Sequence, residues 1–139
     1  MENIQIDWLV VVIAAVLNMI IGFLWYSKWL FGKAWIRLAK LSEKEIKDME
    51  GNKASILYGF VVSLVIAYFL AFFEGYLGVT TVSDGMFVGF CLWLGFVATT
   101  QITSVIWGKR PFQLFLLDAG CKLLSYLVMS GVIGATTFW

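Results

Sequence analysis

The sequence has 139 residues, of which 61% are hydrophobic and 14% charged, with no histidine and a formal net charge of +1. A soluble domain is about 45–50% apolar and about 25% charged, so this composition excludes an ordinary water-soluble globule. Ten basic against nine acidic residues also exclude a basic nucleic-acid-binding protein and an acidic disordered tail. The length fits one domain, and we expect residues 1–139 to form a single unit inside a lipid bilayer.

Four apolar stretches are long enough to cross a bilayer as helices, which takes about 20 residues. They cover residues 8–30, 55–77, 86–107 and 112–136. The first stretch begins after Glu2 and Asp7 rather than after basic residues, and no small-residue cleavage site follows it, so we interpret it as a membrane span and not as a signal peptide. The sequence thus predicts an all-α integral membrane bundle of four transmembrane helices.

The basic residues are concentrated in two of the connections. Nine of the ten lie in residues 28–53 or at Lys109 and Arg110, and the tenth, Lys122, lies within the last span. The positive-inside rule places these two connections in the cytoplasm and both termini outside. We therefore expect a multi-pass protein of the plasma membrane.

The connection at residues 28–53 is expected to contain helices. Its first half has apolar residues at helical spacing, which predicts an amphipathic helix lying in the cytoplasmic membrane interface. Ser42 followed by Glu45 is a capping box that predicts the start of a second, polar helix, and Gly51 is expected to end it. The segment acts either as an interfacial brace or as a site for lipid headgroups or a partner.

Small residues on the spans mark faces where helices pack closely in lipid. The second span has a complete ladder at a spacing of four residues: Ser55, Gly59, Ser63, Ala67, Ala71 and Gly75. Shorter series occur on the other spans, including one on the third span at Cys91, Gly95, Thr99 and Thr103. These faces either all pack within one bundle or also support a homo-oligomer, and we expect the homo-oligomer.

Two charged residues lie within the last span. Counted from Phe112, Asp118 is about 9 Å and Lys122 about 15 Å along the helix. Their spacing of four residues places them on one face, with the acid first, which is the favourable order for an ion pair. The pair either locks the last span to its neighbours or lines a cavity that holds a ligand, because ionisable residues inside membranes often mark such sites.

Further polar residues are expected at the same depth as this pair. They are Thr100, Gln101 and Ser104 of the third span and Asn18 of the first. Together with Asp118 and Lys122, they form a candidate polar site that either binds a small ion or polar solute or satisfies its own hydrogen bonds. Glu74 and Asp84 are expected to form a solvated acidic mouth on the outer side.

The sequence contains no pattern typical of an enzyme. Without histidine there is no Ser-His or Cys-His pair to activate a nucleophile. Cys91 and Cys121 are isolated and are expected to be free thiols, so we expect no metal site, no cofactor and no catalytic residue.

A run of aromatic residues and glycines ends the first span. It reads Gly22-Phe23-Leu24-Trp25-Tyr26-Ser27-Lys28-Trp29-Leu30-Phe31-Gly32-Lys33-Ala34-Trp35. This run resembles that of the small four-span bacterial membrane proteins grouped as domain of unknown function 1761, as do the Arg110-Pro111 turn and the Asp118-Ala119-Gly120 sequence. Members often have proline where this chain has Lys28. The resemblance implies a bacterial inner membrane and the same four-span layout, and it implies no activity.

The aromatic residues of this run are expected to anchor the chain at the membrane interface. The candidate interfacial residues are Trp25, Tyr26, Trp29, Gly32, Lys33 and Trp35. Gly32 is expected to permit the bend between the span and the interfacial helix. For the whole protein, the sequence favours a small oligomeric transporter or channel, and the alternative is a non-catalytic accessory or envelope-organising protein whose Asp118–Lys122 pair only specifies helix packing.

Overall fold

Helices account for most of the residues that the computed structural model describes, which are residues 5–50 and 52–136. In chain order they are α1 (Trp8–Trp25), α2 (Gly32–Ala39), α3 (Glu43–Glu50), α4 (Lys53–Leu77), α5 (Val82–Leu92), η1 (Trp93–Ala98), α6 (Thr99–Ile106) and α7 (Phe112–Thr136). Four helical segments are long and apolar enough to cross a membrane: α1, α4, the run from Val82 to Ile106, and α7. The protein is therefore an all-α, multi-pass membrane bundle.

Local side-chain chemistry explains where the long helices begin. The side chains of Asp7, Asn52 and Thr81 each accept a hydrogen bond from a backbone N–H in the first turn of α1, α4 and α5. Such caps satisfy donors that the helix leaves unpaired. α4 ends at Gly78, whose left-handed φ of 72° suits glycine.

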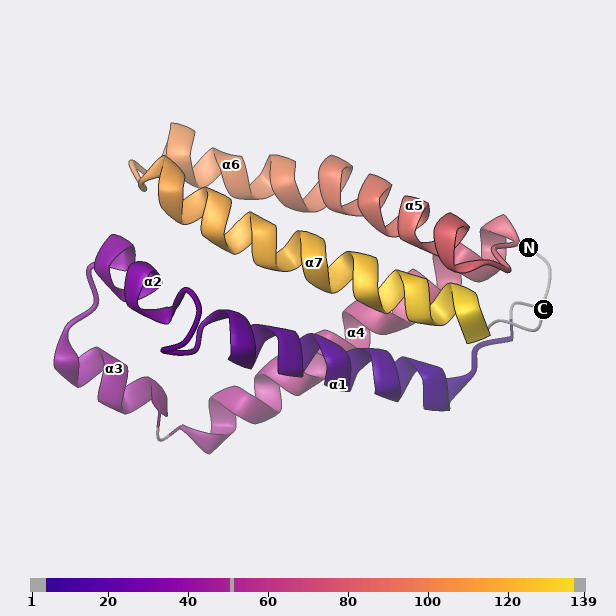
Figure 1. Cartoon of the computed structure of the whole chain (residues 1–139), viewed down its shortest axis with the longest axis horizontal. Coiled ribbons are helices and arrows are strands. Elements are labelled where there is room, and N and C mark those ends of the chain that lie inside the picture. The colour runs from indigo at the N-terminus through magenta and orange to yellow at the C-terminus, as the bar shows by residue number, and fades with distance from the viewer. Residues whose placement is uncertain (1–4, 51, 137–139) are drawn as a thin grey trace.

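α7 is the central helix of the bundle. It packs against α1, α4 and α5, and also contacts α2, η1 and α6. Figure 1 shows α7 running beside α5 and α6 on one side and α1 on the other, while α4 crosses at an angle. We call the end with α2, α3 and the turn between α6 and α7 the basic end, and the end with the α4–α5 connection the opposite end.

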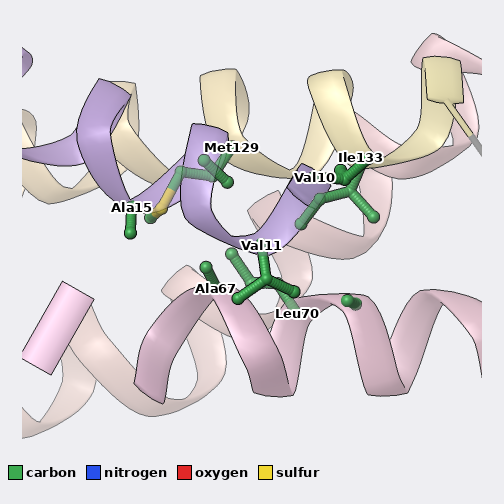
Figure 2. Packing of buried hydrophobic residues seen from close by; sticks show 9 residues of the cluster. Val10, Val11, Ala15, Ala67, Leu70, Met129 and Ile133 are labelled. Carbon is green, nitrogen blue, oxygen red and sulfur yellow. The ribbon is translucent and has the colours of Figure 1, made fainter. Parts of the chain in front are cut away.

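The hydrophobic core lies where α1, α4 and α7 meet. Val11 lies between the small residue Ala67 and Leu70 of α4, and Met129 of α7 closes the cluster from the other side (Figure 2). Ser63, Ala67 and Ala71 of the small-residue ladder are buried, whereas Ser55 at the start of α4 is exposed. The ladder thus packs α4 against α1 within one chain, in agreement with the principle that small residues allow close helix approach in lipid.

The first long helix is shorter than its apolar stretch. α1 ends at Trp25, and residues 26–31 form turns that lead into α2. α2 is amphipathic, with Trp35 and Leu38 half-buried and Lys33 and Arg37 exposed. It packs against α7 at the basic end, which attaches this segment to the bundle.

One of the two hydrogen bonds of the expected capping box is present at the start of α3. The Ser42 hydroxyl accepts a hydrogen bond from the Glu45 backbone N–H at 3.2 Å, as the spacing of these residues predicts. Gly51, expected to end this helix, lies outside the described residues. A polar helix after residue 42 is therefore confirmed, and its predicted stop is not described.

The third membrane-length segment contains a π-helix, η1, between α5 and α6. π-Helices are rare and occur often at functional sites. Phe96 and Val97 of η1 line an open apolar groove of about 350 Å³, together with Phe69 of α4 and Tyr126 of α7. The π-helix therefore forms one wall of a groove that it shares with α4 and α7.

Candidate functional site

Asp118 is joined to the aromatic run at the end of α1. The Tyr26 hydroxyl donates a hydrogen bond to Asp118 Oδ1 at 2.6 Å, and the neighbouring Trp25 indole N–H donates to the Leu117 carbonyl oxygen at 3.1 Å. Both interactions are partly buried. The structure thus brings together two sequence motifs, Trp25-Tyr26 and Asp118-Ala119-Gly120, that lie more than 90 residues apart.

Gly32 determines how the chain leaves α1 after Tyr26. Its backbone N–H donates to the Ser27 carbonyl oxygen at 2.9 Å. A Cβ atom at this position would lie 2.5 Å from the Tyr26 carbonyl oxygen and 2.7 Å from that of Ser27. Glycine is therefore required by the close approach of backbone to backbone, which keeps the turn tight beneath Tyr26.

A second tryptophan contacts the same turn of α7 from the other side. Trp93, the first residue of η1, donates its indole N–H to the Ala119 carbonyl oxygen at 2.9 Å. A Cβ atom on Gly120 would be in ordinary contact with the Trp25 ring, at 3.5 Å. We call residues Leu117–Gly120, held by Trp25, Tyr26 and Trp93, the tryptophan clamp.

Lys122 lies one turn beyond Asp118 and is half-buried. Among the described residues no ion pair within 4 Å joins it to Asp118, and its ammonium makes no hydrogen bond. Asp118 instead accepts the hydrogen bond from the Tyr26 hydroxyl. The two charged residues of α7 therefore have different surroundings, although the sequence places them on one face.

The candidate residues of α6 differ among themselves. Thr100 is exposed and donates its hydroxyl to the Phe96 carbonyl oxygen at 2.7 Å, and Ser104 donates to the Gln101 carbonyl oxygen at 2.7 Å. Both hydroxyls are thus satisfied by backbone of their own segment. Gln101 is different, because its side-chain Oε1 is buried and has no hydrogen-bond partner.

Asn18 interacts with a different helix from the Asp118 group. Its side-chain N–H donates to the Ser63 hydroxyl at 2.7 Å, and that hydroxyl donates to the Gly59 carbonyl oxygen at 2.8 Å. This chain of bonds joins α1 to two residues of the small-residue ladder on α4. Asn18 is accordingly used in packing α1 on α4.

The aromatic interfacial residues divide in the same way. Trp35 packs edge-on against the Tyr26 ring, with centroids 5.3 Å apart. Trp29 is 90% exposed, and Lys33 is also exposed. The run therefore has an inner part that supports the tryptophan clamp and an outer part free to contact headgroups.

Glu74 lies in surroundings that differ from those predicted from the sequence. The expectation of a solvated carboxylate beside Asp84 is wrong for Glu74, which is 0% exposed, although Asp84 is exposed. α5 and α7 pack closely against Glu74 and bury it. Hydropathy alone does not indicate which helices pack against a given residue. Its interval of three residues from the buried Ala71 was the available signal, because it places Glu74 on the inward face of α4.

The family of the chain follows from its sequence between α1 and the end of α7. Residues 9–134 match the family described as protein of unknown function DUF1761. The chain belongs to the DUF1761 family. No curated protein and no solved structure matches it. The match includes Leu117–Gly120 and the three aromatic residues that hold them, so the whole tryptophan clamp lies within the DUF1761 region of the chain.

Proposed function

We propose that this DUF1761 protein is a small membrane carrier or channel for a small ion or polar solute, and that Lys122 is the centre of its binding site. The observation that carries this proposal is the unpaired ammonium of Lys122 within a membrane-length helix. A lone lysine at such a depth costs about 2.5–3.5 kcal/mol on insertion scales. Among the described residues, no ion pair offsets that cost. A ligand that brings negative charge or acceptor oxygens would offset it.

Gln101 supports the same proposal from α6, which packs against α7. Its buried Oε1 has no partner, and a buried acceptor without a donor is unfavourable unless water or a ligand supplies one. A donor such as Lys122 and an acceptor such as Gln101 are the kinds of groups that bind a small polar solute or a hydrated anion. Asp118 then has a structural role, because Tyr26 already occupies its carboxylate.

The proposal includes an orientation and a setting. The basic end faces the cytoplasm by the positive-inside rule, and the membrane is the bacterial inner membrane. The protein acts without catalysis, as a homo-oligomer, and binds no nucleic acid.

Flux through reconstituted vesicles tests the role of Lys122. Vesicles containing the parent protein, Lys122→Met or Lys47→Met are compared for proton, potassium, chloride and phosphate flux. Lys122→Met keeps an unbranched side chain without the charge, whereas Lys47 is an exposed lysine on α3 and serves as the matched control. We expect flux in the parent and in Lys47→Met, and a decrease of about tenfold or more in a folded Lys122→Met, equivalent to about 1.4 kcal/mol or more.

The alternative is a non-catalytic accessory or envelope-organising protein whose polar residues only specify packing. The backbone bonds of Thr100 and Ser104 and the Asn18–Ser63 bond favour it, since these groups are already satisfied. Equal flux in the parent and a folded Lys122→Met, or no flux of any of these ions in the parent, would contradict a Lys122-centred ion pathway.

A further inference from the structure

A second ionisable group lies deep in the bundle, far from Lys122. Glu74 is in the last turn of α4, near the opposite end, and its side chain is 0% exposed. Both carboxyl oxygens are buried, and neither has a hydrogen-bond partner among the described residues. A carboxyl group in such a position requires an explanation, because buried polar groups are normally paired.

The space around the carboxyl group is formed by small residues of two other helices. A Cβ atom on Gly85 of α5 would lie 2.5 Å from Glu74 Oε1 and closer still to the carbonyl oxygen of Ser130 on α7. Glu74 Oε1 and the Ser130 carbonyl oxygen therefore approach the same point beside Gly85. Glycine at position 85 makes room for the carboxyl group, and a hydrogen-bond acceptor lies next to it.

Among the described residues, no lysine or arginine forms a hydrogen bond or ion pair with the carboxyl group. Asp84 of α5 is the nearest charged residue in sequence to Gly85, and Asp7 caps α1 at the same end; both are acidic and exposed. On α7, Tyr126 lies one turn before Ser130, and Lys122 is eight residues before it, about 12 Å along the helix. Every other lysine and arginine of the sequence lies in residues 28–53 or at 109–110, at the basic end.

An ionised carboxylate without a counter-charge is strongly disfavoured in an apolar interior, where the group instead becomes neutral. We propose that Glu74 is a proton-binding site, protonated when α4 is packed against α5 and α7. The carboxylate takes a proton from water at the opposite end, an O–H bond forms, and the hydroxyl becomes a donor facing the Ser130 carbonyl oxygen. Release returns the proton to water and leaves a carboxylate that must be solvated.

A proton fits this site better than a metal ion does. Hard cations take six or more oxygen ligands, usually including several carboxylates. The described residues contain no group of three His, Cys, Asp or Glu side chains able to hold a metal. The backbone of Gly85 also fills the space that a hydrated ion needs.

This site is separate from the proposed Lys122 site, and its existence does not depend on transport. Its chemistry implies that proton exchange is coupled to separation of the α4 end from α5 and α7, because water cannot reach a fully buried oxygen otherwise. The site binds a proton, and it lies where α4 packs against α5 and α7.

Infrared spectroscopy of the protein in vesicles tests the proposal directly. A protonated glutamic acid has a carbonyl stretching band that shifts when the protein is made with isotope-labelled glutamate. We expect this band at neutral pH in the parent protein, a decrease at alkaline pH, and complete loss in Glu74→Gln, which resembles the protonated side chain in shape. The matched control replaces the other four glutamates, Glu2, Glu43, Glu45 and Glu50, with glutamine and should retain the band.

The control variant also decides the matter if Glu74→Gln does not fold, since Glu74 is then its only glutamate. Absence of the band from the folded parent at neutral pH would overturn the proposal, as would a band that persists in Glu74→Gln. Loss of the band on adding sodium or calcium chloride at neutral pH would show that the site takes a metal cation in place of the proton.

Discussion

At the scale of single residues, the hydrogen bond between Tyr26 and Asp118 gives the two charged residues of α7 different roles. The sequence pattern favours an ion pair between Asp118 and Lys122. In the structure, Asp118 instead accepts a partly buried hydrogen bond of 2.6 Å from the Tyr26 hydroxyl. Hydrogen bonds to charged groups contribute about 1.5–3 kcal/mol. Asp118 thus holds the aromatic run in place through Tyr26, and Lys122 remains available to a ligand.

Replacing Tyr26 with phenylalanine should destabilise the protein by about 1–3 kcal/mol, because a partly buried carboxylate loses its donor. Unfolding of the purified protein by increasing denaturing detergent measures the change. Tyr58→Phe, at an exposed position on α4, is the matched control and should have almost no effect. In the double variant Tyr26→Phe/Asp118→Asn the losses should be less than additive, and strict additivity would show that the two side chains are not coupled.

At the scale of helices, the packing of α1 against α4 depends on residues too small to hold the helices apart. Ala14, Ala15, Ala67 and Ala71 are all buried in the core, and Asn18 adds a hydrogen bond to Ser63. In lipid this close contact supplies the attraction that water exclusion supplies elsewhere.

A larger residue on this face should therefore separate the two helices. Ala67→Leu inserts volume at a position that is 0% exposed and should cost about 1–3 kcal/mol through overpacking. Val62→Leu, on the exposed side of the same helix, adds volume toward lipid and should be nearly neutral. The same detergent titration distinguishes them, and equal stability of the two variants would contradict the proposed contact.

Much at this scale could be predicted from the sequence because it is local. Hydropathy predicts helices long enough to span the membrane, the Ser42–Glu45 spacing predicts a cap, and four-residue spacing predicts the buried face of α4. The Tyr26–Asp118 bond could not be predicted, since it joins residues 92 positions apart and nothing local specifies the partner. The spacing of Glu74 from Ala71 indicated the inward face of α4, but the room for its carboxyl group depends on the absence of a side chain at Gly85, a feature of another helix.

At the scale of the whole molecule, one face of the third membrane-length segment has no partner within the described bundle. Cys91, Gly95 and Thr99 are exposed, and a Cβ atom on Gly95 would contact nothing within 4 Å. Small exposed residues on a membrane helix suit close contact with a second copy of the chain. We therefore expect that the homo-oligomer proposed above, if it forms, uses this face.

Cross-linking in native membranes tests this expectation. With Cys121 replaced by serine, a short thiol-specific cross-linker should join chains through the exposed Cys91, and the parent should behave alike because Cys121 is buried. Cys91→Ser should form no such product. Monomers alone in every sample, at protein levels where the chain is folded, would argue that these residues face lipid.

The central position of α7 also has a consequence for how the protein is made. α1, α4 and the third segment leave the ribosome before the helix that each of them packs against, and domains ordinarily fold from their N-terminal part during synthesis. Before α7 is made, α1 can pack against α4 and α4 against α5, whereas Trp25, Tyr26 and Trp93 still lack their partners on α7. The bundle is thus completed only after α7 has been made, and a chain truncated before α7 would leave these groups without their partners.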